Sequence, residues 1–115
     1  MKYFTDNFER RGTCYHEFTR GKWDGKTYWS DNSMYLRDDY MNDLKLYELV
    51  FKPAFAEFGK SFSRWGVNEV TRELWEGMLS HAMDIGGEVW ELFAEITIWA
   101  EKSLSGDDSF SILGI

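Results

Sequence analysis

The sequence predicts a mainly α-helical protein, a single-domain bundle of three to four helices that follows an irregular or hairpin-containing N-terminal segment. An apolar stripe between Leu36 and Trp65 recurs about every 3.6 residues, which is the period of an α-helix. Two later segments are amphipathic with the same period. We therefore divide the chain into an N-terminal segment (1–32), a helical core (33–104) and a tail (105–115).

The N-terminal segment carries one hairpin signal. Asp24-Gly25 is typical of a two-residue hairpin turn, because both turn positions must tolerate a positive φ. The flanking segments 19–23 and 26–30 would then be short strands. An irregular loop is the alternative.

The apolar stripe defines the first helical region. The N-cap residues 31–33 predict that this region begins near residue 34. Pro53 lacks an N–H and would clash with the carbonyl one turn earlier, so we expect either two helices, 34–51 and 53–65, or one kinked helix. The stripe consists of Leu36, Tyr40, Leu44, Tyr47, Phe51, Phe55, Phe58, Phe62 and Trp65.

Two more helices are expected in the second half. Gly66 is placed to end the first region in the left-handed conformation, and Asn68 to cap a helix that reaches residue 85. Gly86-Gly87 ends that helix, and a last helix follows over 88–104. The apolar tail is expected to fold back onto the core or to bind a partner.

The net charge of −7 is unevenly distributed along the chain. Residues 1–65 carry 10 acidic and 11 basic side chains, whereas residues 66–115 carry 10 acidic and only 2 basic ones. This balance argues against nucleic acid as a direct ligand, because phosphate contacts require Lys and Arg. It favours a basic protein partner that the negative field attracts.

The sequence contains no apolar run of the roughly 18 residues that a membrane-spanning helix needs. Charged residues interrupt the region after Met1, where a signal peptide would have its apolar core. We therefore expect a cytoplasmic protein without a membrane partner.

The residues do not indicate catalysis, a cofactor or a metal site. Cys14 and His16 are two residues apart but lack the second ligand pair of a zinc motif. Nucleophilic catalysis by Cys14 with His16 or His81 is conceivable, but a half-buried thiol and a surface imidazole are the simpler interpretation. Glycine-rich phosphate loops are absent. We expect no enzyme activity.

The carboxylates of the second half form a candidate partner-binding surface. Like charges three or four residues apart mildly destabilise a helix, and this half lacks the basic residues that would offset them. The alternative is a simply solvated surface. Trp90 lies outside the apolar face of its helix and is a candidate anchor, as are Trp23 and Trp29. The proposed binding residues are Glu69, Glu73, Glu76, Asp84, Glu88, Trp90, Glu91 and Glu95.

In size, charge and composition the chain resembles small bacterial immunity proteins, which neutralise a cognate toxin by presenting acidic and aromatic side chains to its basic active-site surface. The resemblance implies an inhibitor of a nuclease-like toxin domain. The nearest alternative is a phage-encoded inhibitor such as an anti-CRISPR protein, whose acidic helices imitate a nucleic-acid backbone. Further alternatives are a homodimer and a small ligand-binding or enzymatic domain with an aromatic pocket. That pocket would be lined by Phe55, Phe58, Phe62 and Trp65.

Overall fold

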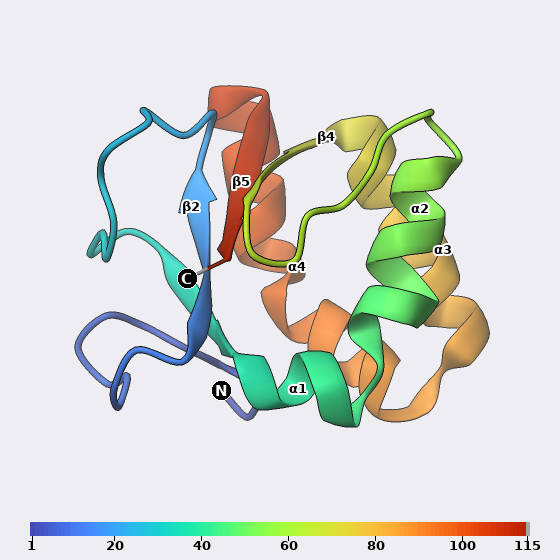
Figure 1. Cartoon of the computed structure of the whole chain (residues 1–115), viewed down its shortest axis with the longest axis horizontal. Coiled ribbons are helices and arrows are strands. Elements are labelled where there is room, and N and C mark those ends of the chain that lie inside the picture. The colour runs from blue at the N-terminus through green and yellow to red at the C-terminus, as the bar shows by residue number, and fades with distance from the viewer. Residues whose placement is uncertain (115) are drawn as a thin grey trace.

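The computed structural model describes residues 1–114 and contains a five-stranded antiparallel sheet with helices packed on one face (Figure 1). The prediction of a mainly α-helical bundle is therefore wrong, and the chain has an α/β fold. The spatial order of the strands is β1-β3-β2-β5-β4. Their bounds are β1 Phe4–Thr5, β2 Tyr15–Arg20, β3 Met34–Arg37, β4 Val67–Thr71 and β5 Ser109–Gly114.

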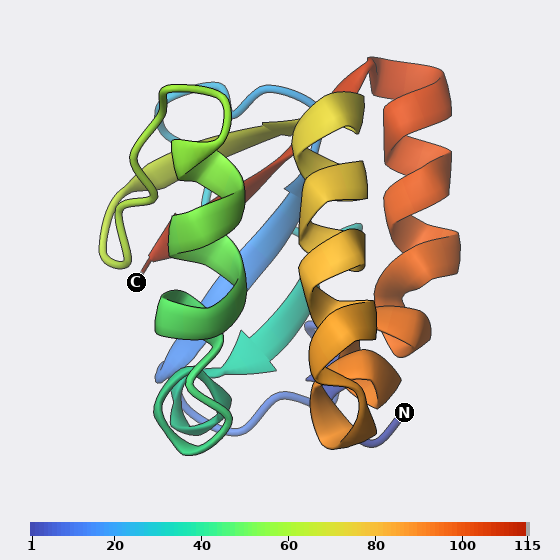
Figure 2. The same cartoon turned by 90° about the vertical axis from the view of Figure 1, so that its right-hand side faces the viewer.

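The helices form a second layer over the sheet. Figure 2 shows α2, α3 and α4 side by side in front of the strands. The predicted break between the last two helices is confirmed at Gly86, which has a φ of 71° and is the C-cap of α3. The helical elements are α1 Asp38–Asp43, the π-helix η1 Tyr47–Phe51, α2 Lys52–Ala56, α3 Arg72–Ile85 and α4 Gly87–Asp107.

Two strands lie where the sequence predicted helix. β3 pairs with both β1 and β2, and its residues Tyr35 and Leu36 are buried on opposite faces of the sheet. A short strand that is buried on both faces shows no alternation of polar and apolar residues, so it reads as part of a helical stripe. β4 precedes α3, whose N-cap is Thr71 rather than Asn68.

The apolar tail is a strand inside the sheet. β5 lies between β2 and β4, and its residues Phe110 and Ile112 are fully buried. Residue 115 of the predicted tail lies outside the described residues. Of the two alternatives around Asp24-Gly25, the irregular loop is confirmed and the hairpin is wrong, because residues 21–33 form a loop without strands.

The apolar stripe crosses a strand, three helical segments and a loop instead of following one helix. Phe51 and Phe62 stack in the core with ring centroids 4.6 Å apart. By contrast, Phe58 is 43% exposed and Trp65 is 60% exposed. The helical chain continues through Pro53, which lies in the first turn of α2. The predicted left-handed residue is Gly59, with a φ of 69°, and not Gly66.

Gly77 lies in the interior of α3, and its replacement by alanine is expected to stabilise the fold. The added Cβ would meet the Phe58 ring at 3.6 Å and the Ala54 Cβ at 3.9 Å, which are ordinary contacts. Alanine removes the conformational entropy that glycine loses in a helix, so we expect a gain of about 0.5–1 kcal/mol in a urea unfolding experiment. Gly87→Ala is the control and should lower the stability, because the backbone φ of 55° at Gly87 is unfavourable for a residue with a side chain. A destabilised Gly77→Ala variant would contradict the placement of Gly77 inside α3 with room for a methyl group.

Candidate functional site

The antiparallel pair α3 and α4 carries most of the predicted partner-binding residues (Figure 2). Residues exposed on this pair mix carboxylates with large apolar side chains. We name eight of these residues the α3–α4 face: Glu73, Glu76, Met83, Asp84, Glu88, Trp90, Glu91 and Ile98. The pair also exposes two basic residues, Arg72 and Lys102.

The apolar part of the α3–α4 face is exposed to solvent. Met83 is 63% exposed, Ile98 is 73% exposed and Trp90 is 36% exposed. At about 100° per residue, Trp90 and Glu101 lie on the same flank of α4. Glu101 forms a 3.0 Å ion pair with Arg72 of α3, which identifies this flank as the one that faces α3. Trp90 is therefore close to the seam between the two helices.

The charge of the α3–α4 face is mostly uncompensated. Among the described residues, Glu73, Glu76, Asp84 and Glu88 make no side-chain hydrogen bond and no ion pair within 4.0 Å. The charges of Glu73, Glu76 and Asp84 therefore act on solvent and on any molecule that approaches, whereas the charge of Glu88 also acts on the Lys2 ammonium. Such a field attracts a basic surface and raises its association rate.

Two predicted binding residues are partly engaged within the protein. Glu95 accepts backbone hydrogen bonds from Lys2, Tyr3 and Phe4 at 2.8–3.0 Å. Glu91 accepts a 2.9 Å bond from the Tyr3 hydroxyl, and the Lys2 ammonium lies 3.9 Å away. The carboxylate of Glu95 thus holds the N-terminal segment against α4. The sequence could not show this, because the partners are about 90 residues apart.

Glu69 lies on a strand and is separated from the other acids. It belongs to β4, where Val70 faces the helical layer and is buried in the core. Because side chains alternate along a strand, Glu69 points to the opposite face of the sheet. Its carboxylate accepts a 2.9 Å bond from the Ser109 hydroxyl.

Glu17 is a buried charged residue that the sequence analysis did not single out. It is fully buried on β2 and faces away from the helices. Its carboxylate accepts hydrogen bonds from the backbone N–H groups of Trp29 (2.8 Å) and Ser30 (3.1 Å). The Ser33 hydroxyl donates a third bond of 2.6 Å. Glu17 therefore holds the 21–33 loop against the outer face of the sheet.

The aromatic residues of this loop are stacked in place. The Trp29 ring stacks on the Tyr35 ring, and the Arg10 guanidinium lies 3.9 Å above the Trp29 ring. Burial raises the pKa of Tyr35 above its usual value, and the nearby Glu17 charge adds to this effect. The Tyr35 hydroxyl therefore stays protonated and donates to the Ser30 carbonyl at 2.6 Å.

His16, Asp38 and Arg64 form a second polar cluster, on the helical side of the sheet. The imidazole Nε2 lies 2.7 Å from the Asp38 carboxylate, and Arg64 donates to the same oxygen at 3.2 Å. Burial lowers the pKa of His16, the Asp38 hydrogen bond opposes this effect, and the Arg64 charge reinforces it. Burial raises the pKa of Asp38, but the hydrogen bonds from His16 and Arg64 lower it by a larger amount, so the net shift is downward. Asp38 is therefore ionised and His16 is neutral at neutral pH.

This arrangement does not favour the Cys-His alternative. The Nε2 atom of His16 is engaged with Asp38, and its Nδ1 atom is buried without a hydrogen-bond partner among residues 1–114. Cys14 is exposed, and His81 is hydrogen-bonded to Glu57, the residue that follows α2. Within residues 1–114, no group of three or more His, Cys, Asp or Glu side chains is placed to hold a metal ion.

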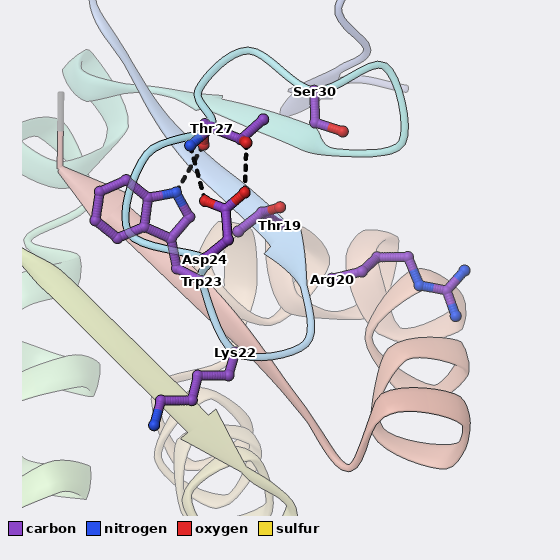
Figure 3. Close-up of a pocket in the computed structure, with 7 residues that line it drawn as sticks. All are labelled: Thr19, Arg20, Lys22, Trp23, Asp24, Thr27 and Ser30. Atoms are coloured by element: carbon purple, nitrogen blue, oxygen red, sulfur yellow. Dashed lines mark hydrogen bonds between the residues drawn. The ribbon is translucent and has the colours of Figure 1, made fainter.

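A small polar pocket of about 200 Å³ lies beside the 21–33 loop (Figure 3). Hydrogen bonds link the residues of its wall: the Trp23 indole N–H donates to the Thr27 carbonyl, and the Asp24 carboxylate accepts from the backbone N–H groups of Lys26 and Thr27. The bond from the Thr27 hydroxyl and the backbone bonds from Thr27 and Lys26 lower the pKa of Asp24 to about 2. In Figure 3 the Arg20 and Lys22 side chains extend away from the hydrogen-bonded group of Trp23, Asp24 and Thr27. Its lining consists of Thr19, Arg20, Lys22, Trp23, Asp24, Thr27 and Ser30.

The predicted aromatic pocket is not assembled from its four proposed residues. The rings of Phe55 and Phe62 pack edge to face in the core, with centroids 5.2 Å apart. Phe58 and Trp65 lie at the surface instead. Two of the four rings are therefore core residues.

In the part of the chain that the structure describes, no helix is long and apolar enough to cross a membrane. Comparison with family models, curated proteins and solved structures found no significant match for this chain.

Proposed function

We propose that this chain is a protein-binding inhibitor that docks the basic surface of another protein on its α3–α4 face. The observation that carries the proposal is the uncompensated charge of Glu73, Glu76, Asp84 and Glu88 on a helix pair that also exposes apolar side chains. The resemblance to immunity proteins supports the narrower proposal that the partner is a nuclease-like toxin domain whose active-site surface the protein covers.

The composition of the α3–α4 face fits a protein interface better than a simply solvated surface. Interfaces place aromatic and other apolar anchors inside a polar rim, and their hot spots are enriched in tryptophan. In this proposal the exposed Trp90 and Met83 would be the anchors, and carboxylates of the same helix pair would form part of the polar rim. A second copy of the same acidic face is a poor partner, because two like-charged surfaces repel each other.

The double variant Glu73→Lys/Glu76→Lys is expected to fold normally and to lose partner association. Both side chains are exposed, and neither makes a hydrogen bond or ion pair within the described residues. The matched control is Glu9→Lys/Glu48→Lys, which changes the net charge equally at exposed positions outside the face. Each immobilised protein is exposed to a lysate of the source cells, and the association rate of the captured partner is then measured at several salt concentrations.

We expect a basic protein that binds the wild type and the control, with an association rate at low salt at least about tenfold lower for the double variant. Added salt should weaken the wild-type complex, because screening reduces interactions between exposed charges. If the double variant and the control associate equally fast, the α3–α4 face is not the docking surface. If the partner binds normally but retains its own activity in the complex, the protein is not an inhibitor.

A further inference from the structure

A short turn that carries an exposed tryptophan rests on the ends of β2 and β5. We name residues 63–66 the Trp65 turn. The Gly114 N–H donates to the Gly66 carbonyl at 2.8 Å, and the Ser63 carbonyl accepts from the Gly66 N–H at 3.2 Å. A Cβ on Gly114 would lie 2.2 Å from the Arg64 carbonyl oxygen, so the turn packs directly on the strand backbone.

The Trp65 turn covers the buried imidazole of His16. The Trp65 ring stacks on it with centroids 5.7 Å apart and an interplanar angle of 27°. The sheet holds His16 itself in place, since this residue lies on β2 between Leu36 of β3 and Gly114 of β5. The Trp65 turn lies in the segment between α2 and β4, outside any helix or strand.

A second proton on His16 would form an N–H group for which the described residues offer no acceptor. The Asp38 carboxylate faces Nε2 from α1 and already accepts from Arg64 of the turn. Within the described part of the chain, Asp38 and Arg64 are the charged groups that face the imidazole, and the strand neighbours Leu36 and Gly114 carry no charged side chain. Protonation would place an N–H at Nδ1, which is buried and has no hydrogen-bond partner among the described residues.

The Nε atom of Arg64 is likewise buried, and no described residue gives it a hydrogen bond. Leaving a buried donor unsatisfied is costly, and the cost is larger for a charged group. Water that reached the imidazolium would stabilise it. The Trp65 turn covers the imidazole, and it can move without breaking a strand or a helix.

We propose that His16 is a proton switch for the Trp65 turn: protonation of the imidazole is accommodated by release of the turn from the ends of β2 and β5. The released state keeps the sheet and the helices, hydrates the imidazolium and frees the Trp65 indole. The consequence is a surface at this end of the sheet that differs between neutral and mildly acidic conditions.

The direction of the pH effect follows from the shift in the pKa of His16. Its value in the closed state lies below the ordinary value of 6.5 that it regains once the turn is released. The closed state is therefore fully stable above pH 6.5, and it loses stability as the pH falls below that value. One proton is taken up per opening event, so the opening constant rises by at most about tenfold for each pH unit.

Nuclear magnetic resonance between pH 7.5 and 5.0 tests the switch. The readouts are the Trp65 indole N–H signal, assigned with a Trp65→Phe variant, and the exchange protection of the Gly114 amide. We expect the Trp65 signal to shift and the Gly114 protection factor to fall towards tenfold per pH unit, while the helical circular dichroism stays constant. The midpoint should coincide with the titration of the His16 ring signals in the same samples.

His16→Gln should abolish the pH dependence of both readouts, and His81→Gln, which removes the other histidine, should preserve it. The wild-type ring titration tests the same link if His16→Gln does not fold. The switch is refuted if Trp65 and Gly114 do not respond down to pH 5.0, or if their response does not follow the His16 titration. Loss of helical signal over the same range also refutes it, because the proton would then act on the whole fold.

Discussion

Replacing Glu17 by alanine is expected to lower the free energy of unfolding by about 3 kcal/mol, since each buried donor left unsatisfied costs roughly 1–3 kcal/mol. The change removes the acceptor for the Trp29 and Ser30 backbone N–H groups and for the Ser33 hydroxyl. Trp29 has a φ of 60°, which a non-glycine residue adopts only when its surroundings enforce it. The loss of Glu17 should therefore loosen the loop around Trp29 as well as weaken the fold.

Urea unfolding followed by circular dichroism measures this effect, and near-ultraviolet signals report on Trp29. Glu17→Gln should be intermediate, because an amide keeps one acceptor oxygen but turns an NH₂ group towards one of the donors. Glu9→Gln is the matched control, since Glu9 is exposed. If Glu17→Ala unfolds at the same urea concentration as the control, Glu17 does not hold the loop.

Replacing Phe51 by alanine is expected to cost about 3–5 kcal/mol, which is the usual range for a large aromatic side chain removed from a core. Phe51 is fully buried and contacts the rings of Phe62 and Phe93, with centroids 4.6 and 5.9 Å away. Phe58→Ala is the informative comparison, because the two residues belong to the same apolar stripe of the sequence. Phe58 is exposed, so its replacement should change the stability by less than about 1 kcal/mol.

Thermal and urea unfolding of both variants decide this comparison. Equal losses for Phe51→Ala and Phe58→Ala would mean that the stripe acts as one continuous buried face, as in the helical bundle that the sequence suggested. Unequal losses in the expected order would support the α/β arrangement, in which the stripe is divided among several elements.

The two long helices show what can be predicted from local sequence. α3 and α4 each bury a face that recurs with the helical period, and the glycine pair between them offers the positive φ that a helix end needs. Their exposed carboxylates were predicted for the same reason, because a solvent-facing side of a helix is readable from periodicity. The start of α3 was predicted too early, since the β4 residues Val67 and Val70 also match that period.

The sheet could not be predicted in the same way. β2 pairs with β5 across about 95 residues of sequence, and β3 is buried between two partners. The pairing energy of such strands comes from distant neighbours, so their own residues need not alternate. The π-helical turn η1 before Pro53 likewise keeps the apolar stripe nearly in phase with the helical period. The stripe therefore suggested helix over the whole of residues 34–65, which the structure does not contain.

The candidate sites likewise divide into features that depend on local sequence and features that depend on contacts between distant residues. The sequence by itself determined the acidic second half, the α3–α4 helix pair and the absence of known catalytic or metal motifs, because charge and helical periodicity are local properties. Only the tertiary structure decided that Glu95 holds the N-terminus, that Glu17 holds a loop and that His16 lies buried beneath Trp65. Each of these roles depends on a partner brought from a distant part of the chain, and the partner, not the residue, determines whether a charge is exposed or enclosed.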